Sequence, residues 1–378
     1  MTKGPEPEKH LPFTETDTLK AQGQPPGLQI ETITKCPLCG NRDLKLWRKG
    51  KDLLLGVSSQ RFLYVRCSDC DLVILSNRPT PDSIGLFYPE NYHPYSDPLA
   101  TAESQKRRVS PVERFLEIID TRAFQNFRRK LLERVERRYP DQVIPAMQSF
   151  YKPPKRGAVL LDFGCGSVWF LNRQRDTRWN TIGMDFKEEL VAQVRREGHR
   201  GILVSDSGWR EIENESVDAV RMNHVLEHLY EPMEVLSQLF AKLKPGGMIH
   251  IAVPNPYGIS ARLFRSRWFS LEAPRHLMIY SPAGLKRVLS GLGFVDIQVL
   301  HERTPKDFSR SAGYVLRGLG LLNPNLVQAM GDEPVLNSWF APLLSLAGGK
   351  GYGDRIHAFA RKPAFSASTE PSKEPHST

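Results

Sequence analysis

A short segment with two glycines and an acid, residues 161–166 (Leu-Asp-Phe-Gly-Cys-Gly), has the composition of a ligand-binding loop. Gly164 and Gly166 lack Cβ, so the backbone can turn sharply and leave room for a ligand. The carboxylate of Asp162 repels a pyrophosphate but suits a ligand that carries positive charge. A dinucleotide site also needs a third glycine three residues after the second, where this sequence has Trp169. The loop therefore predicts a different kind of cofactor site.

Two further acids follow the next two predicted strands. Asp185 ends the strand 181–185, and Asp206 follows the strand 202–205. Ligands of open α/β sheets bind outside the carboxyl ends of the strands, so these acids and Asp162 would surround one crevice. Asp185 can accept both hydroxyl protons of a ribose, and Asp206 can accept from an amino group. The alternative is a generic doubly wound domain in which the same acids cap helices.

Four of the five cysteines form two CxxC pairs: Cys36, Cys39, Cys67 and Cys70. Two such pairs can supply four thiolates to one tetrahedral Zn²⁺ and leave no open coordination position, so the site would be structural. A redox CxxC motif belongs on a βα unit, whereas short strand-like runs at 61–66 and 72–75 lie beside the second pair. We therefore predict a zinc ribbon over residues 28–77.

Residues 156–363 alternate between strand and helix patterns. Strand-like runs occur at 158–161, 181–185, 202–205, 216–222, 248–253, 295–299 and 355–360, with helical stretches such as 188–197 and 232–243 between them. Alternating strands and helices imply an α/β fold with a mostly parallel sheet covered by helices on both faces.

Residues 78–155 form a predicted connector that contains one long amphipathic helix, from about 111 to 138. Apolar residues recur there at spacings of three and four, and Ser110 and Pro111 suit the helix start. The stretch 105–138 has eleven Lys and Arg against five Asp and Glu. This charge favours a solvated helix face over a phosphate-binding or membrane-binding patch.

Composition sets the remaining expectations. The chain of 378 residues has a net charge of +10, which is compatible with anionic partners without selecting one. The polar stretches 1–27 and 364–378 are predicted to be disordered. No apolar run reaches the roughly 18 residues that span a bilayer, so we expect a cytoplasmic protein. The apolar segment 340–347 either covers the active site or makes a peripheral membrane contact.

The stretch 159–299 resembles class I S-adenosylmethionine-dependent methyltransferases. The matching pieces are 161–166, Gly183-Met-Asp185, Val217-Asp-Ala-Val220, Asn223-His-Val-Leu-Glu-His228, Leu243-Lys-Pro-Gly-Gly247, Pro274-Arg-His276, Tyr280-Ser-Pro282 and Gly293-Phe294. A zinc ribbon ahead of this domain, with the connector 88–92, resembles a bacterial subgroup often associated with glycan or small-metabolite modification.

This resemblance implies a seven-stranded Rossmann-like sheet with an antiparallel last strand, and S-adenosylmethionine as the cofactor. The cofactor-binding positions it implies are Asp162, Phe163, Gly164, Gly166, Asp185, Phe186, Asp206, Ser207 and Asn223. By position, Asp185 would hold the ribose, Asp206 with Ser207 the adenine, and Asn223 would lie next to the methyl group. The sequence departs from the family at Val168, where a glycine is usual and a β-branched side chain adds bulk beside the cofactor.

Methyl transfer from a sulfonium requires alignment of the acceptor with the methyl group, and a hydroxyl acceptor benefits from a general base. His276 is the first candidate base, and His228 with Glu227 is the second. Any of these histidines has a structural role as its alternative. Arg275 either binds an anionic substrate group or pairs with an acid.

The sequence therefore predicts a methyltransferase that acts on a small molecule such as a sugar, a lipid-linked compound or a secondary metabolite. An RNA methyltransferase with a zinc ribbon for RNA contact is the alternative, although the ribbon lacks a dense basic-aromatic strip. A third interpretation, motivated by Val168, is a non-catalytic binding protein. Nothing in the sequence sets the acceptor atom or the oligomeric state.

Overall fold

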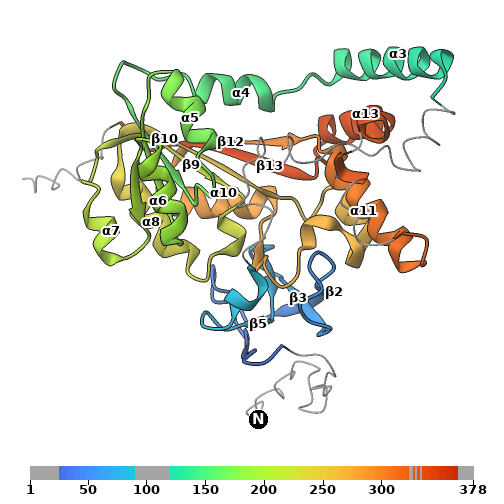
Figure 1. Cartoon of the computed structure of the whole chain (residues 1–378), viewed down its shortest axis with the longest axis horizontal. Helices are drawn as coiled ribbons and strands as arrows, with labels where there is room; N and C mark the ends of the chain where they lie inside the picture. Colours follow the sequence, from blue (N-terminus) through green and yellow to red (C-terminus); the bar gives the residue numbers. More distant parts are fainter. Residues whose placement is uncertain (1–24, 90–119, 323–326, 328–329, 333, 365–378) are drawn as a thin grey trace, which may run out of the picture.

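The computed structural model describes residues 25–89, 120–322, 327, 330–332 and 334–364 (Figure 1). Most of the two predicted disordered tails, and the first part of the predicted long helix with Ser110 and Pro111, lie outside these residues. A central sheet carries helices on both faces, and a smaller strand-rich module lies below it in the view of Figure 1.

Seven strands form the central sheet in the order β12-β13-β10-β9-β6-β7-β8. Their bounds are β6 Val159–Phe163, β7 Asn180–Asp185, β8 Arg200–Leu203, β9 Val217–Asn223, β10 Leu243–Pro254, β12 Val295–Glu302 and β13 Arg355–Arg361. The strands from β6 to β10 pair in parallel, and β13 runs antiparallel between β10 and β12. The predicted α/β fold with an antiparallel last strand is confirmed.

The helices around this sheet are amphipathic. They are α5 Trp169–Asp176, α6 Glu188–Arg196, α7 Asp206–Arg210, α8 Pro232–Lys242, α9 Ile259–Phe264, α10 Pro282–Gly291, α11 Pro305–Gly318 and α13 Pro334–Gly349. In α6, Leu190, Val191 and Val194 are buried, because spacings of three and four residues place them on one helix face. Acidic residues begin α6 and arginines end it, which complements the helix dipole.

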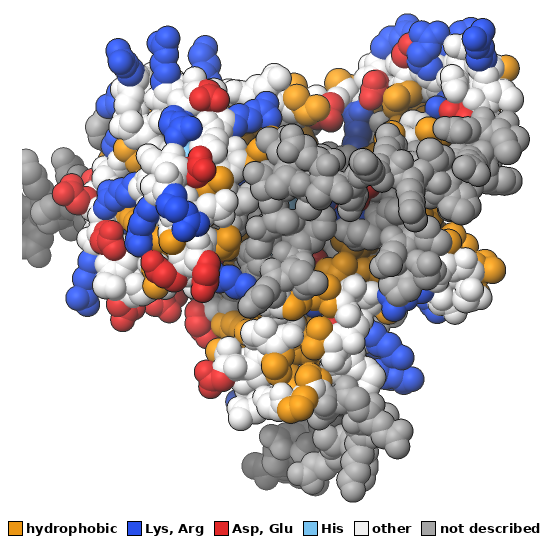
Figure 2. Space-filling view, in the orientation of Figure 1, with side chains coloured by type: hydrophobic (Ala, Val, Ile, Leu, Met, Phe, Trp, Pro, Cys, Tyr) orange, Lys and Arg blue, Asp and Glu red, His pale blue; other side chains and the backbone are white. Residues whose placement is uncertain are grey.

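The connecting helix, α3, spans Arg122–Arg138 and begins at its N-cap Thr121, whose Oγ1 accepts from the Phe124 backbone N–H. None of its residues is buried, and Phe127 is 63% exposed. Figure 2 shows Lys and Arg side chains gathered over this end of the molecule. The C-terminal part of the predicted range 111–138 is helical, with its start at Arg122 rather than near Pro111, and its apolar stripe packs little. The main contact of α3 is with α13, where Phe124 meets Trp339. The following helix, α4 Val143–Phe150, instead buries both of its end residues.

The cysteine-containing module, residues 30–79, is built from short strands. These are β1 Ile30–Thr32, β2 Leu44–Gly50, β3 Phe62–Cys67, β4 Val73–Leu75 and β5 Asn77–Pro79. One strand from much later in the chain, β11 Met278–Ile279, pairs with β4 and completes the four-stranded sheet β11-β4-β3-β2. The module therefore shares a sheet with the region that follows β10.

One hydrophobic core extends across both parts. Phe62, Tyr64 and Ile74 of the module are fully buried in the same cluster as Met278 and Tyr280. Folding of the module and folding of the larger region are therefore coupled through shared apolar contacts.

The apolar segment 340–347 lies in α13 and is largely buried at Pro342, Leu344 and Ala347. It packs beside α11 and α3. Within the described residues, no helix is both long enough and apolar enough to cross a bilayer.

Candidate active site

A cavity of about 1040 Å³ lies between the cysteine module and the carboxyl edge of the central sheet. The module contributes Leu54 to its wall, the segment that follows the module contributes Pro81 and Tyr88, and the sheet side contributes the glycine loop and Asn223. The volume is at the upper end of the range for pockets that hold small ligands. It therefore offers room for a cofactor and an acceptor together.

The glycine loop forms the turn that the sequence predicts. Gly164 and Gly166 have φ values of 69° and 60°, in the left-handed region that glycine adopts without strain. A Cβ on Gly164 would lie 2.5 Å from Cγ2 of Val225, so the close approach of these two loops also requires glycine. Both glycines line the cavity.

Asp185 lies at the end of β7 and holds this loop. Its carboxylate accepts hydrogen bonds from the backbone N–H groups of Gly166 (2.9 Å), Phe186 (2.8 Å) and Lys187 (3.2 Å). Burial raises the pKa of Asp185, although these three bonds oppose the shift. Asp185 and the half-exposed Phe186 both line the cavity, where the sequence predicts the ribose contact.

Asp162 lies behind the loop and is fully buried. Both of its carboxylate oxygens accept from Nη1 of Arg221 on β9, at 2.8 and 3.0 Å. Burial alone would lower the pKa of Arg221, but the Asp162 carboxylate more than reverses this and raises it. Arg221 lines the cavity and Asp162 does not. The predicted cofactor contact of Asp162 stays a prediction, and Arg221 is a cavity residue that sequence reasoning missed.

Of the four remaining predicted cofactor positions, Asn223, after β9, lines the cavity, whereas the other three do not. Phe163 is fully buried and stacks on Trp209, with ring centroids 5.6 Å apart. Asp206 and Ser207 are exposed at the start of α7, outside the cavity wall. Their predicted contacts with adenine would therefore require the ligand to reach past the cavity edge.

Val168, the departure from the family pattern, does not add bulk to the cavity. Its side chain is only 5% exposed and packs in a hydrophobic cluster with Phe170 and Leu171. The cavity wall is instead made by its neighbours Ser167 and Trp169. The sequence-based concern that this valine crowds the cofactor is therefore not supported by the side chain's position.

The three predicted catalytic residues come together at the cavity. Glu227 and His228 lie in a 3-10 turn after β9, and His276 comes from the segment before β11. The His228 and His276 rings are 4.7 Å apart, and Nε2 of His276 is 3.9 Å from Oε1 of Glu227. His228 and His276 line the cavity, while Glu227 is fully buried behind them. His224, which sequence reasoning did not single out, joins them: its Nδ1 is 3.1 Å from Oε1 of Glu227.

The electrostatics of this cluster favour a carboxylate beside a neutral imidazole. Burial would raise the pKa of Glu227, but the hydrogen bond from His224 and the nearby histidines lower it to about 2. Burial and the neighbouring His276 lower the pKa of His228 to about 4. At neutral pH, His228 is therefore uncharged and Glu227 is ionised.

The cysteine module holds the segment that carries His276. The hydroxyl of Tyr64, on β3, donates to the backbone carbonyls of His276 (3.0 Å) and Leu271 (3.1 Å). Arg275 is fully buried and pairs with Asp52 of the module at 2.8 Å and with Glu272 at 3.1 Å. Arg275 thus takes the second of its two predicted roles, that of pairing with acids.

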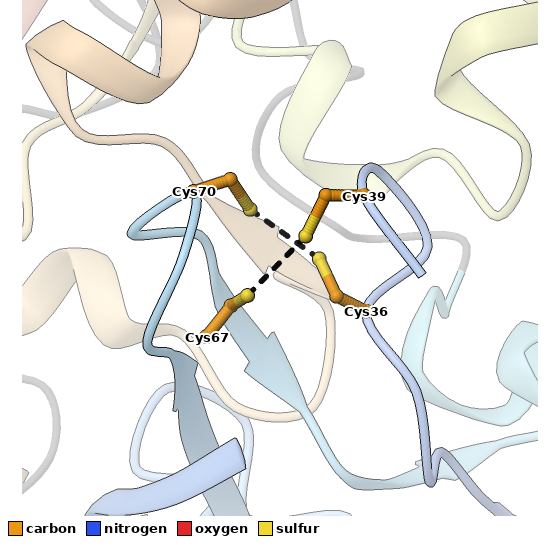
Figure 3. A group of neighbouring side chains, drawn as sticks. All are labelled: Cys36, Cys39, Cys67 and Cys70. Atoms are coloured by element: carbon orange, nitrogen blue, oxygen red, sulfur yellow. Dashed lines mark hydrogen bonds between the residues drawn. The ribbon is translucent and has the colours of Figure 1, made fainter. Parts of the chain in front are cut away.

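The four predicted zinc ligands also come together (Figure 3). Sγ atoms of Cys36 and Cys70 are 3.4 Å apart, and those of Cys39 and Cys67 are 3.5 Å apart. A disulfide is much shorter, at about 2.05 Å, whereas four thiolates around a tetrahedral zinc ion lie about 3.8 Å apart. All five cysteines are free, so this cluster has the donor set and spacing of a closed structural metal site.

Comparisons with known proteins agree with this geometry. Residues 131–299 match a family model described as a methyltransferase domain. A probable S-adenosylmethionine-dependent methyltransferase of Mycolicibacterium smegmatis is 32% identical over 26% of this chain and 39% of its own length. A tRNA U34 carboxymethyltransferase of Pseudoalteromonas translucida is 27% identical over 42% of this chain and 50% of its own. A trans-aconitate 2-methyltransferase of Deinococcus radiodurans is 25% identical over 40% of this chain and 64% of its own.

These matches span between 39% and 64% of the length of the relatives. The printed names of the relatives differ in the acceptors that they name. Residues 131–299 are therefore similar to methyltransferase domains, and the comparisons leave the acceptor open.

Proposed function

We propose, from the methyltransferase domain that residues 131–299 carry, that this protein is an S-adenosylmethionine-dependent methyltransferase. The observation that carries the proposal is the cavity at the carboxyl edge of the sheet, where the glycine loop and Asp185 face His228 and His276. S-adenosylmethionine supplies an activated methyl group when it is bound there. The residues of this chain then have to hold it, orient the acceptor and exclude water.

The loop backbone and Asp185 are the proposed cofactor-holding groups. Gly166 brings backbone close to the ligand, and Asp185, fixed by three backbone N–H groups, presents the rest of its carboxylate to a ribose. Asn223 lines the same cavity after the neighbouring strand β9 and is the proposed contact next to the methyl group.

His276 is the proposed general base. Its Nδ1 lies 2.9 Å from the carbonyl oxygen of Ser270, and a carbonyl only accepts, so Nδ1 carries the proton. In the neutral ring, Nε2 therefore has a free lone pair in the cavity wall. A hydroxyl of the acceptor could pass its proton to this nitrogen as its oxygen attacks the methyl carbon.

A small-molecule acceptor fits the charge of the cavity wall better than a nucleic acid. Three arginines line the cavity, and each has an acidic partner: Arg221 with Asp162, Arg355 with Asp307, and Arg310 with Asp332. Paired arginines contribute little of the uncompensated positive charge that binds a phosphate backbone. We therefore propose a small acceptor such as a sugar, a lipid-linked compound or a secondary metabolite.

The four-cysteine cluster is proposed to hold one structural zinc ion, with Cys36, Cys39, Cys67 and Cys70 as its ligands. Its thiols stay available for zinc in a reducing compartment, so a cytoplasmic location is part of this proposal.

The proposal is tested by calorimetry with S-adenosylhomocysteine on the zinc-loaded protein. We expect saturable binding by the wild type and binding at least about tenfold weaker for Asp185→Ala, which loses a charge-assisted contact to ribose. Asp296→Ala, an exposed acid on β12, is the matched control and should bind like the wild type. No binding by folded, zinc-loaded wild type would contradict the proposal, and a salt-sensitive gel shift with RNA would favour a nucleic-acid acceptor.

A further inference from the structure

Two cavity residues and the buried acid behind them form a second group with the donor atoms of a metal site. Glu227, His228 and His276 each offer one ligand atom, and these atoms all lie within 4.8 Å of one another. Two of the residues are neighbours in a turn, while the third comes from the segment held by the cysteine module. The group is distinct from the four-cysteine cluster, which contains sulfur donors only.

The hydrogen bonds of the two imidazoles leave one nitrogen of each ring for a metal. Nδ1 of His276 donates to the Ser270 carbonyl at 2.9 Å, and Nδ1 of His228 lies 3.0 Å from the Arg275 carbonyl. Because carbonyl oxygens only accept, both Nδ1 atoms carry protons, and each Nε2 is the nitrogen with a lone pair. Metal-binding histidines commonly have this arrangement, in which a carbonyl orients the ring through the second nitrogen.

The carboxylate of Glu227 has a buried oxygen with no protein partner. Its Oε1 accepts from His224, but Oε2 has no hydrogen-bond partner among the described residues, although the side chain is fully buried. A buried carboxylate oxygen without a partner is strongly destabilising. Because Oε1 is the oxygen that lies 3.9 Å from Nε2 of His276, a cation between Glu227 and the two histidines would bind Oε2 after a rotation of the carboxylate.

The charges around the group also favour a cation. Besides Glu227, the carboxylate of Glu272 approaches, with Oε2 3.6 Å from Nε2 of His276. Glu272 also pairs with Arg275 at 3.1 Å, and Nδ1 of His224 lies 3.1 Å from Oε1 of Glu227. Two carboxylates and two imidazoles therefore lie close together in this group.

We propose that Glu227, His228 and His276 bind a divalent first-row transition-metal ion that faces the cavity. Two imidazoles and one carboxylate suit zinc, manganese or iron(II), and three protein ligands leave coordination positions open for a ligand. Bonds of about 2.1 Å in a tetrahedral site place ligand atoms about 3.4 Å apart, so Glu227 and His276 need only small side-chain rotations from their separation of 3.9 Å.

This site rests on the proposed function and gives His276 a different role in it: Nε2 of His276 binds the ion here, and it acts as the general base only where no ion is bound. An acceptor hydroxyl bound to the ion loses its proton more readily. The proton passes to solvent, the oxygen forms a bond to the methyl carbon, and the carbon–sulfur bond breaks with its electron pair left on sulfur. The predicted substrate class is therefore an acceptor with a hydroxyl that can bind the ion.

The test uses the full-length protein loaded with one equivalent of zinc, so that the four-cysteine site is filled. Mn²⁺ is then titrated and free Mn²⁺ is followed by electron paramagnetic resonance, because sulfur-rich sites discriminate against manganese. We expect one Mn²⁺ site in the wild type and binding at least about tenfold weaker in Glu227→Gln and in His276→Ala. His301→Ala, a partly buried histidine on β12 outside the group, is the control and should bind like the wild type.

S-adenosylhomocysteine binding by the same variants separates this proposal from the proposed function. Both ligand variants should keep that binding, which also shows that they are folded. Absence of Mn²⁺ binding by the wild type, or equal binding by Glu227→Gln, overturns the metal site and leaves the histidines as proton-transfer groups. Loss of S-adenosylhomocysteine binding by the wild type would instead contradict the proposed function.

Discussion

Two clusters of metal-ligand type differ in how the chain builds them. The four-cysteine cluster takes its ligands from two CxxC pairs, each fixed by local spacing, and it is enclosed by the module (Figure 3). The Glu227–His228–His276 cluster joins a turn after β9 to a distant segment and opens on the cavity. A metal site whose coordination positions are all filled by protein ligands is typical of a structural role, whereas a site with an open coordination position is typical of catalysis.

The two clusters are also connected. The module that the cysteines organise supplies Tyr64 to the backbone of His276 and Asp52 to Arg275 beside it. The module that the four-cysteine cluster organises therefore positions His276 of the Glu227–His228–His276 cluster. The predictions below test this dependence, beginning with the largest expected effect.

Removing one cysteine should affect both clusters. Cys67→Ser, or extraction of zinc by a strong chelator, is expected to unfold the module, because structural zinc contributes about 10 kcal/mol or more to the folding of small domains. Cysteine 165 lies outside the cluster, so Cys165→Ser is the matched control. Metal analysis should show one zinc ion less per chain, and circular dichroism should show loss of structure for Cys67→Ser alone. Unchanged zinc content would contradict the assignment.

Removing a histidine of the open cluster should affect activity without unfolding the protein. His276→Ala is expected to lower kcat by about 10² to 10⁴, the usual contribution of a positioned proton-transfer group, with thermal stability changed little by comparison. The measurement is methyl transfer to the acceptor once it is identified, beside a melting curve. Equal losses of kcat and of folded protein would instead indicate a structural histidine.

The buried ion pair Arg275–Asp52, which joins the larger region to the module, should contribute more to the free energy of unfolding than an exposed ion pair. Arg275→Met leaves Asp52 buried without its cation, and we expect destabilisation of about 3–5 kcal/mol. Arg287→Met removes the exposed pair with Asp69, which also joins the module to the region of α10, and should change stability by at most about 1 kcal/mol. Denaturant unfolding measures the free energy of unfolding of both variants. Similar losses of stability would show that burial does not determine how much the Arg275–Asp52 pair contributes.

A buried carboxyl outside both clusters provides a comparison in pH dependence. Burial raises the pKa of Asp354 to about 7, although Ser260 donates two hydrogen bonds to it. The folded protein therefore keeps this proton where the unfolded chain has lost it, and stability should fall as pH rises from about 4 to about 7, by at most about 4 kcal/mol. Asp354→Asn should flatten this part of the profile; an unchanged slope would show that Asp354 does not titrate there.

Local patterns were sufficient to predict much of the site. Cys36 and its three partners were predicted from spacing alone, because CxxC pairs bind metals through local geometry. Gly164 and Gly166 were predicted from the need for a sharp turn, and their positive φ values confirm it. The strands of the central sheet were predicted from apolar runs, since buried parallel strands are apolar on both faces.

Other features had no signal in the sequence. Arg221 lies between Val220 and Met222 in β9, and only the neighbouring position of β6 and β9 brings it to Asp162. Likewise, Met278 and Ile279 form a two-residue strand that is recognisable only beside β4. Such pairings depend on the register between distant segments, which composition and periodicity do not encode.

The sequence by itself indicated the α/β fold, the glycine loop, the four cysteines as metal ligands and the histidines as candidate bases, because these depend on residue types at short spacing. Only the tertiary structure decided which donors meet, since His276 reaches Glu227 through the contacts of Tyr64 and Arg275 with the module. It also decided that Val168 points into the core and that Asp162 faces an arginine. Short-range spacing fixes what a residue can do, and packing between distant segments determines what it contacts.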